Sequence, residues 1–76
     1  MKEELLKIIN IIRDNKALPP LTAINDQDSL RKDIGFSSFD LAELTVRIED
    51  MFDIDIFEDG LVSTVHEILE RLNIEK

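Results

Sequence analysis

Apolar residues recur at helical spacing near the beginning of the chain. Four aliphatic residues follow one another at i, i+3, i+4 and i+7, which is the spacing of the buried stripe of an amphipathic helix. They are Leu5, Ile8, Ile9 and Ile12. This pattern predicts a helix over residues 2–15.

The helical periodicity stops in residues 16–36, which are rich in residues that favour turns. Pro19, Pro20 and Gly35 interrupt helices, and several Asn and Asp residues lie between them. Loops longer than about 12 to 15 residues are uncommon in compact domains and are usually functional or pinned to the core. Aliphatic residues are spaced along this loop, namely Leu18, Leu21, Ile24, Leu30 and Ile34. We therefore expect an ordered loop that crosses a helical bundle.

A second helix is predicted over residues 37–52. Ser37 and Asp40 fit a capping box, in which the serine hydroxyl caps the helix and the carboxylate returns to the serine amide. After this helix, Ile54 and Ile56 alternate with acids as in a strand, but four residues without a partner strand form no sheet. We expect these isoleucines to enter the core, followed by a short helix over residues 57–62.

The last helix is predicted over residues 63–73. Thr64 and Glu67 fit a second capping box. Core spacing continues with Val65, Ile68, Leu69 and Leu72. Because 76 residues leave room for one domain only, the predicted fold is all-α: residues 1–76 form a small antiparallel bundle of three main helices plus a short third helix.

The predicted second helix has an apolar face in addition to its core stripe. The core stripe consists of Leu41, Leu44, Ile48 and Phe52. On a helical wheel, Phe39, Ala42 and Val46 fall on the far side, beside acidic residues. A small apolar strip ringed by acids suits the docking of a partner with a basic rim. The alternative is that Phe39 covers the end of the core and Val46 is an isolated exposed residue, which is common.

The chain is acidic, with 17 Asp and Glu against nine Lys and Arg and a net charge of -8. Such a charge repels phosphate backbones and anionic lipid headgroups, so we expect no nucleic-acid partner and no membrane insertion. Charged residues also interrupt the first apolar positions, which argues against a signal peptide or membrane span there. We expect a monomeric cytoplasmic protein whose partners carry basic faces.

The residue arrangements of common catalytic and metal sites are missing from the sequence. The absence of cysteine excludes a thiol nucleophile and zinc–thiolate sites. His66 is the only histidine, and the acids around Asp53, Asp55 and Asp59 do not fit a calcium loop. There is no Ser–His–Asp arrangement and no glycine-rich phosphate loop. We therefore expect neither an enzyme nor a metal site.

The segment from Asp33 to Leu44 carries the most specific signal in the chain. It reads DIGFSSFDLAEL, a glycine turn that brings serine hydroxyls to the positive end of a helix, where a phosphate is favoured. Taken alone, such a serine is usually a helix cap. The segment resembles the signature of the acyl carrier proteins and peptidyl carrier domains, D-[LI]-G-x-[DH]-S-[LI]-x-x-x-E-L. The order and lengths of the predicted elements resemble that family over the whole chain.

This resemblance implies a role for Ser38. In that family, the serine at the start of the second helix receives a 4'-phosphopantetheine arm from coenzyme A through a separate Mg-dependent phosphopantetheinyl transferase. Ser38 matches this position because it lies three residues after Gly35 and five before Glu43, whereas Ser37 breaks both spacings. The cargo of the family is held as a thioester on the arm, which accounts for a carrier without cysteine.

The resemblance also implies that the second helix docks partner enzymes. These would be the transferase and acyl-loading, synthase or transferase enzymes with basic faces. The matching residues are Phe39, Asp40, Ala42, Glu43, Val46, Glu49 and Asp50. The chain departs from the family at Ser37, where Asp or His is usual, at Phe39, where Leu or Ile is common, and at Arg47, a cation within the acidic face. These departures point to a dedicated pathway.

We therefore expect a discrete acyl carrier protein without catalytic activity of its own, in fatty acid, polyketide or related biosynthesis. A peptidyl or aminoacyl carrier is the nearest alternative. An unmodified acidic helical module that binds a basic partner is the alternative from another class. Modification of Ser38 distinguishes this module from both kinds of carrier.

Overall fold

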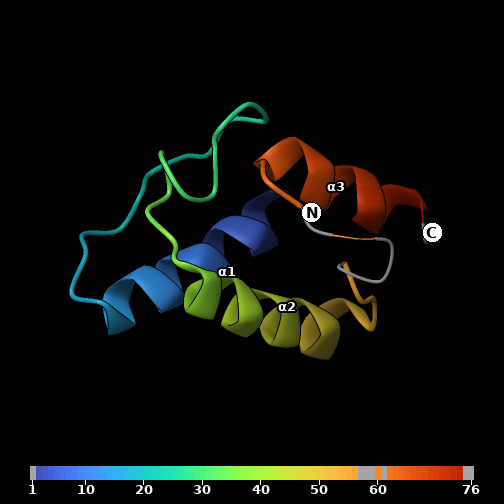
Figure 1. Cartoon of the computed structure of the whole chain (residues 1–76), viewed down its shortest axis with the longest axis horizontal. Coiled ribbons are helices and arrows are strands. Elements are labelled where there is room, and N and C mark those ends of the chain that lie inside the picture. Colours follow the sequence, from blue (N-terminus) through green and yellow to red (C-terminus); the bar gives the residue numbers. More distant parts are fainter. Residues whose placement is uncertain (1, 57–59, 61, 75–76) are drawn as a thin grey trace.

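A computed structural model describes residues 2–56, 60 and 62–74, and it contains three helices joined by loops (Figure 1). The helices are α1 (Lys2–Asn15), α2 (Ser38–Phe52) and α3 (Val65–Ile74). Those residues form no strand, and an isolated bridge joins Ser29 and Thr64. The predicted all-α fold is confirmed. The short helix expected over residues 57–62 falls largely on positions 57–59 and 61, which lie outside the described residues.

The helices α1 and α2 lie side by side and run in opposite directions (Figure 1). Their apolar stripes face a common core to which α3 and both connections also contribute. The buried core residues are Leu5, Ile8, Ile9, Ile12, Ile24, Leu30, Ile34, Phe36, Leu41, Leu44, Ile48, Ile56, Val62, Val65, Ile68 and Leu72. All but Phe36 are aliphatic, so burial of Ile, Leu and Val side chains supplies most of the hydrophobic stabilisation. None of the helices described is long and apolar enough to cross a membrane.

The connection between α1 and α2 is fastened to the start of α3 by backbone hydrogen bonds. The Leu30 amide donates to the Ser63 carbonyl at 2.9 Å, and the Val65 amide donates to the Asp28 carbonyl at 3.1 Å. The His66 amide donates to a loop carbonyl at 2.8 Å. The bonds from Val65 and His66 satisfy amides in the first turn of α3 that have no partner within the helix. The loop is thereby held against α3, and its last residues lead directly into α2.

The end of α1 turns the chain back towards the bundle. Ala17 has a left-handed backbone conformation, with φ at 61°, and the Leu18 amide donates to the Arg13 carbonyl at 2.9 Å. This is the type of bond that closes the carbonyl end of many helices. As a result, Arg13 and Lys16 lie close to the segment that precedes α2, with which both form hydrogen bonds.

Candidate functional site

The two serines at the start of α2 have different surroundings. Ser37 is the N-cap residue: its hydroxyl accepts a hydrogen bond from the Asp40 amide at 3.3 Å. The Asp40 carboxylate in turn accepts bonds from the Ser37 amide at 2.9 Å and from the Ser37 hydroxyl at 3.0 Å. This is the reciprocal capping box that the sequence predicted. Ser38, the first residue of α2, takes no part in it and is exposed.

A cation lies against the hydroxyl of Ser38. Nη2 of Arg31 donates a hydrogen bond to Oγ of Ser38 at 2.6 Å. Arg31 belongs to the connection between α1 and α2, and the sequence did not identify it as a site residue. The only sequence signal was a cation seven positions before the serine, and this spacing alone does not establish a contact across a loop.

A cavity of about 390 Å³ lies beside Ser38. It is formed by the loop, by the first turns of α2 and by the segment before α3. Its lining residues are Ser29, Leu30, Arg31, Ser38, Leu41, Ala42, Val62 and Ser63. Apolar side chains with a few polar groups are typical of sites that bind small organic groups, and the volume is in the range of such sites. A pantetheine arm, which combines methyl groups with amides, fits this kind of lining.

The segment before Ser38 is held by two cations, one in the last turn of α1 and one just beyond it. Arg13, which is 9% exposed, donates from Nε to the Pro19 carbonyl at 3.0 Å and from Nη1 to the Ile34 carbonyl. Lys16 donates to the Gly35 carbonyl at 3.0 Å. Gly35 has a φ of 88°, a conformation that side chains with a Cβ rarely adopt. These contacts fix the turn that delivers Ser38 to the surface.

Asp40 is buried and does not lie on the partner-facing surface where we expected it. We expected it on the partner-facing surface with the other acids of α2, but it is 7% exposed and forms an ion pair with Lys16. Burial by itself raises the pKa of its carboxyl group, whereas hydrogen bonds from Lys16 and Ser37 and the charge of Lys16 lower it, so that the pKa lies below its ordinary value. The expectation came from the resemblance to the carrier family and not from the helical wheel, on which Asp40 lies beside Leu44 at the edge of the core stripe. Asp40 is a structural residue.

The opposite side of α2 is exposed. Phe39 is 82% exposed and Val46 is 66% exposed, and Ala42 is also exposed. The alternative in which Phe39 covers the end of the core is therefore wrong. We call this surface the docking face, after the role that the sequence predicts for it, and define it as Phe39, Ala42, Glu43, Val46, Glu49 and Asp50.

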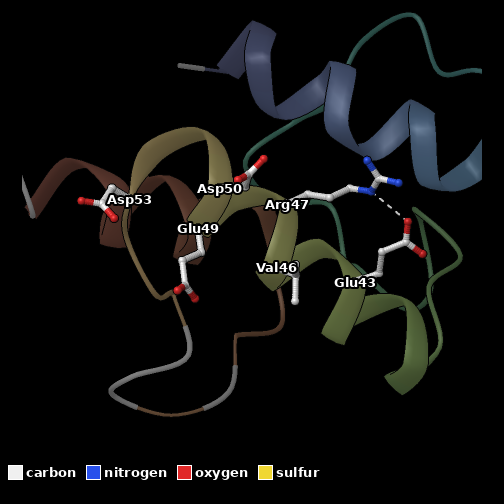
Figure 2. A pocket seen from close by; sticks show the side chains of 6 residues that line it. All are labelled: Glu43, Val46, Arg47, Glu49, Asp50 and Asp53. Atoms are coloured by element: carbon white, nitrogen blue, oxygen red, sulfur yellow. Dashed lines mark hydrogen bonds and ion pairs between the residues drawn. The ribbon is translucent and has the colours of Figure 1, made fainter.

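Four acidic residues line a shallow depression along α2 together with Val46 and Arg47. In Figure 2 the side chains of Val46 and Glu49 point to one side of the helix and the carboxylate of Asp50 points to the other, while Arg47 extends towards Glu43. Nε of Arg47 lies 2.8 Å from Oε2 of Glu43, so this cation neutralises an acid of its own helix. Within the part of the chain that the structure describes, no cation is paired with Glu49 or Asp50. Negative charge therefore remains available at this end of the docking face.

Residues outside this region offer little catalytic or metal chemistry. His66 is exposed, and its Nε2 lies 3.3 Å from Oε2 of Glu70 on the same helix. In residues 2–56, 60 and 62–74, no three His, Asp or Glu side chains are grouped so that they could hold a metal ion.

Two comparisons with known proteins show what the chain is similar to. The family described as "Phosphopantetheine attachment site" matches residues 6–73, a range that contains α2 and Ser38. An acyl carrier protein of Amoebophilus asiaticus (strain 5a2) is 35% identical over 74 residues, which cover 95% of this chain and 91% of that protein.

Proposed function

Because the chain belongs to the phosphopantetheine attachment family, to which the acyl carrier proteins belong, we propose that Ser38 is the residue that carries the arm. Members of this family hold 4'-phosphopantetheine covalently and act as carriers. The observation that supports the proposal is the contrast between the two serines: both are exposed, but the Ser37 hydroxyl is engaged in the helix cap, whereas Ser38 takes no part in the cap and lines a cavity.

The attachment requires an accessible hydroxyl in a fixed position. Oγ of Ser38 forms a bond to the phosphorus that bears the pantetheine in coenzyme A. The bond from this phosphorus to the nucleotide breaks, 3',5'-ADP leaves, and the serine proton passes to a base of the transferase. Exposure of Ser38 admits the transferase, and the contacts of Arg13 and Lys16 keep the preceding turn in place. The attached arm supplies the thiol that the chain lacks.

The docking face is the surface that we propose for partner enzymes. Glu49 and Asp50 stand in the last turn of α2, where the turn contains no basic residue. Acids at the carboxyl end of a helix oppose the helix dipole, at a cost of about 0.3–1 kcal/mol each. Helix stability therefore does not explain their placement. Binding of a basic partner does, because complementary charge accelerates encounter and favours the correct partner.

We propose an acyl cargo rather than an aminoacyl cargo, in fatty acid, polyketide or related biosynthesis. Two observations support this. The curated relative is an acyl carrier protein, and Leu30, Leu41, Ala42 and Val62 give the cavity beside Ser38 an apolar lining. Mass spectrometry of the arm released from protein isolated from its native host tests the cargo. An amino acid on the arm would contradict this assignment.

The attachment site is tested by intact mass after incubation with coenzyme A, Mg²⁺ and a broad-specificity transferase. We expect the wild type and Ser37→Ala to gain one phosphopantetheinyl group, and Ser38→Ala to gain none. Ser37→Ala is the matched control because it removes the neighbouring hydroxyl and costs about 1 kcal/mol of helix capping. A mass gain that persists in Ser38→Ala would overturn the site. A wild type without any gain would instead support an unmodified interaction module.

A further inference from the structure

Arg31 is placed where an attached phosphate would lie. Its guanidinium contacts Oγ of Ser38 at 2.6 Å, both side chains are exposed, and both line the cavity of about 390 Å³. A serine hydroxyl is neutral and is readily solvated by water, so a hydrogen bond to it at the surface contributes little to stability. A full positive charge at this position would interact much more strongly with a phosphodiester attached to the same hydroxyl.

We propose that Arg31 binds the phosphate group of the attached arm and directs the arm along the cavity. The proposal rests on the attachment at Ser38 argued above. The phosphorus atom would be bonded to the same Oγ that Arg31 already contacts, and its two unesterified oxygens would lie one bond further away. The guanidinium has a planar fork of donors that binds two such oxygens at once. A phosphodiester is anionic at neutral pH, so the contact becomes charge-assisted.

The backbone around Arg31 is fixed, so its side chain starts from a defined position. Leu30 is fully buried, and its carbonyl accepts a hydrogen bond from the Phe36 amide at 2.8 Å. Ser29 accepts bonds from the amides of Asp33 at 2.9 Å and Ile34 at 3.0 Å. The turn is therefore anchored on both sides of Arg31, and holding the guanidinium near Ser38 needs no rearrangement of the loop.

Lys32 provides a matched control within the same turn. It is exposed and has the same charge as Arg31, but Ser29, Leu30 and Arg31 line the cavity and Lys32 does not. A general effect of positive charge on the arm would appear when either residue is neutralised. A specific phosphate contact would appear only with Arg31.

The experiment uses the loaded protein and its phosphorus NMR signal. Wild type, Arg31→Gln and Lys32→Gln are loaded with the transferase, and intact mass verifies one arm on each. At low ionic strength, where exposed charges are least screened, we expect the ³¹P resonance of Arg31→Gln to differ from the wild type and that of Lys32→Gln to coincide with it. Equal resonances in all three proteins, or equal shifts in both variants, would overturn the role of Arg31.

A second measurement applies if the transferase fails to load Arg31→Gln. The side-chain Nε–H resonance of Arg31 is assigned in the unloaded protein from its absence in Arg31→Gln, and it is then compared in the wild type before and after loading. A shift on loading, with the Arg47 resonance unchanged, supports the phosphate contact, and an unchanged Arg31 resonance overturns it. A wild type that takes no arm contradicts the attachment itself, so the two failures are distinguishable.

Discussion

Lys16, just beyond the end of α1, forms an ion pair with Asp40 in the first turn of α2. The Asp40 side chain is 10% exposed and that of Lys16 is 32% exposed, so water screens the pair only in part. The same lysine donates to the Gly35 carbonyl. One cation therefore joins α1 to the capping box of α2 and to the turn before Ser38, and the proposed attachment site depends on a contact between distant parts of the sequence.

Neutralising Lys16 should destabilise the fold. We expect Lys16→Gln to lower the free energy of unfolding by about 1–3 kcal/mol, because it leaves a buried carboxylate without its charged partner. Urea unfolding measures this, with Lys7→Gln on the exposed side of α1 as the control within about 0.5 kcal/mol. Adding Asp40→Asn should recover part of the loss, since residues in contact are energetically coupled. Strict additivity of the two substitutions would contradict the pairing.

Acidification should remove the contribution of Asp40. A carboxyl group with a lowered pKa in the folded state stabilises the fold above its unfolded pKa, about 3.9 for Asp, and this stabilisation is lost as the pH falls through the folded pKa. The difference in stability between wild type and Asp40→Asn should therefore be constant from pH 7 to about pH 5 and shrink below about pH 4. Unfolding measured from pH 7 to pH 2.5 tests this. A difference that stays constant down to pH 2.5 would contradict a stabilising role of the ionised Asp40 carboxylate.

Neutralising the acids at the end of α2 should raise the stability of the fold and weaken the binding of partner enzymes. At low ionic strength we expect Glu49→Gln and Asp50→Asn each to raise the free energy of unfolding by about 0.3–1 kcal/mol, because they relieve an unfavourable interaction with the helix dipole. Both should lower kcat/KM of the transferase several-fold, since rim charges act mainly on association. Glu3→Gln is the control, because Glu3 lies in the first turn of α1, where an acid interacts favourably with the helix dipole. Its neutralisation should lower the free energy of unfolding. Unchanged loading kinetics would show that Glu49 and Asp50 do not contribute to binding of the transferase.

Phe39 should matter for partners and not for the fold. Its side chain is 82% exposed, so we expect Phe39→Ala to change stability by less than about 0.5 kcal/mol. An aromatic anchor at an interface is often worth more than 1.4 kcal/mol, which is tenfold in affinity, so kcat/KM for loading should fall about tenfold. Ile11→Ala, which truncates a 46% exposed residue on α1, is the control. If both variants load equally well, Phe39 is not an anchor for the transferase.

The all-α fold class and the helix cap could be predicted because both depend on residues close together in the sequence. Core positions repeat every three or four residues, as Leu5 and Ile8 do. The capping box connects Ser37 with Asp40, three positions apart, so hydroxyl and carboxylate types at that spacing are sufficient to predict it.

The surroundings of Ser38 could not be predicted in the same way. The Lys16–Asp40 pair spans 24 positions, and the bond from Arg13 to the Ile34 carbonyl spans 21. Such contacts depend on how the loop folds over the helices, which no local periodicity encodes. For this reason Arg31 received no role, and the resemblance to the carrier family placed Asp40 on the outer face without its partner Lys16.

The hydrogen bonds between the loop and the start of α3 must break if the cavity beside Ser38 is to widen. One wall of the cavity comes from the loop at Leu30 and another from Val62 and Ser63 before α3, and the Leu30–Ser63 bond joins the two. Because parts of a protein can open at a lower free energy than global unfolding, we expect local opening of this junction to widen the cavity while α1 and α2 stay paired. A longer cargo should therefore speed amide hydrogen exchange at Leu30 and His66 and leave the amide of Ile9 protected. The free energy of opening the junction between the loop and α3 would then set the length of cargo that the cavity accepts.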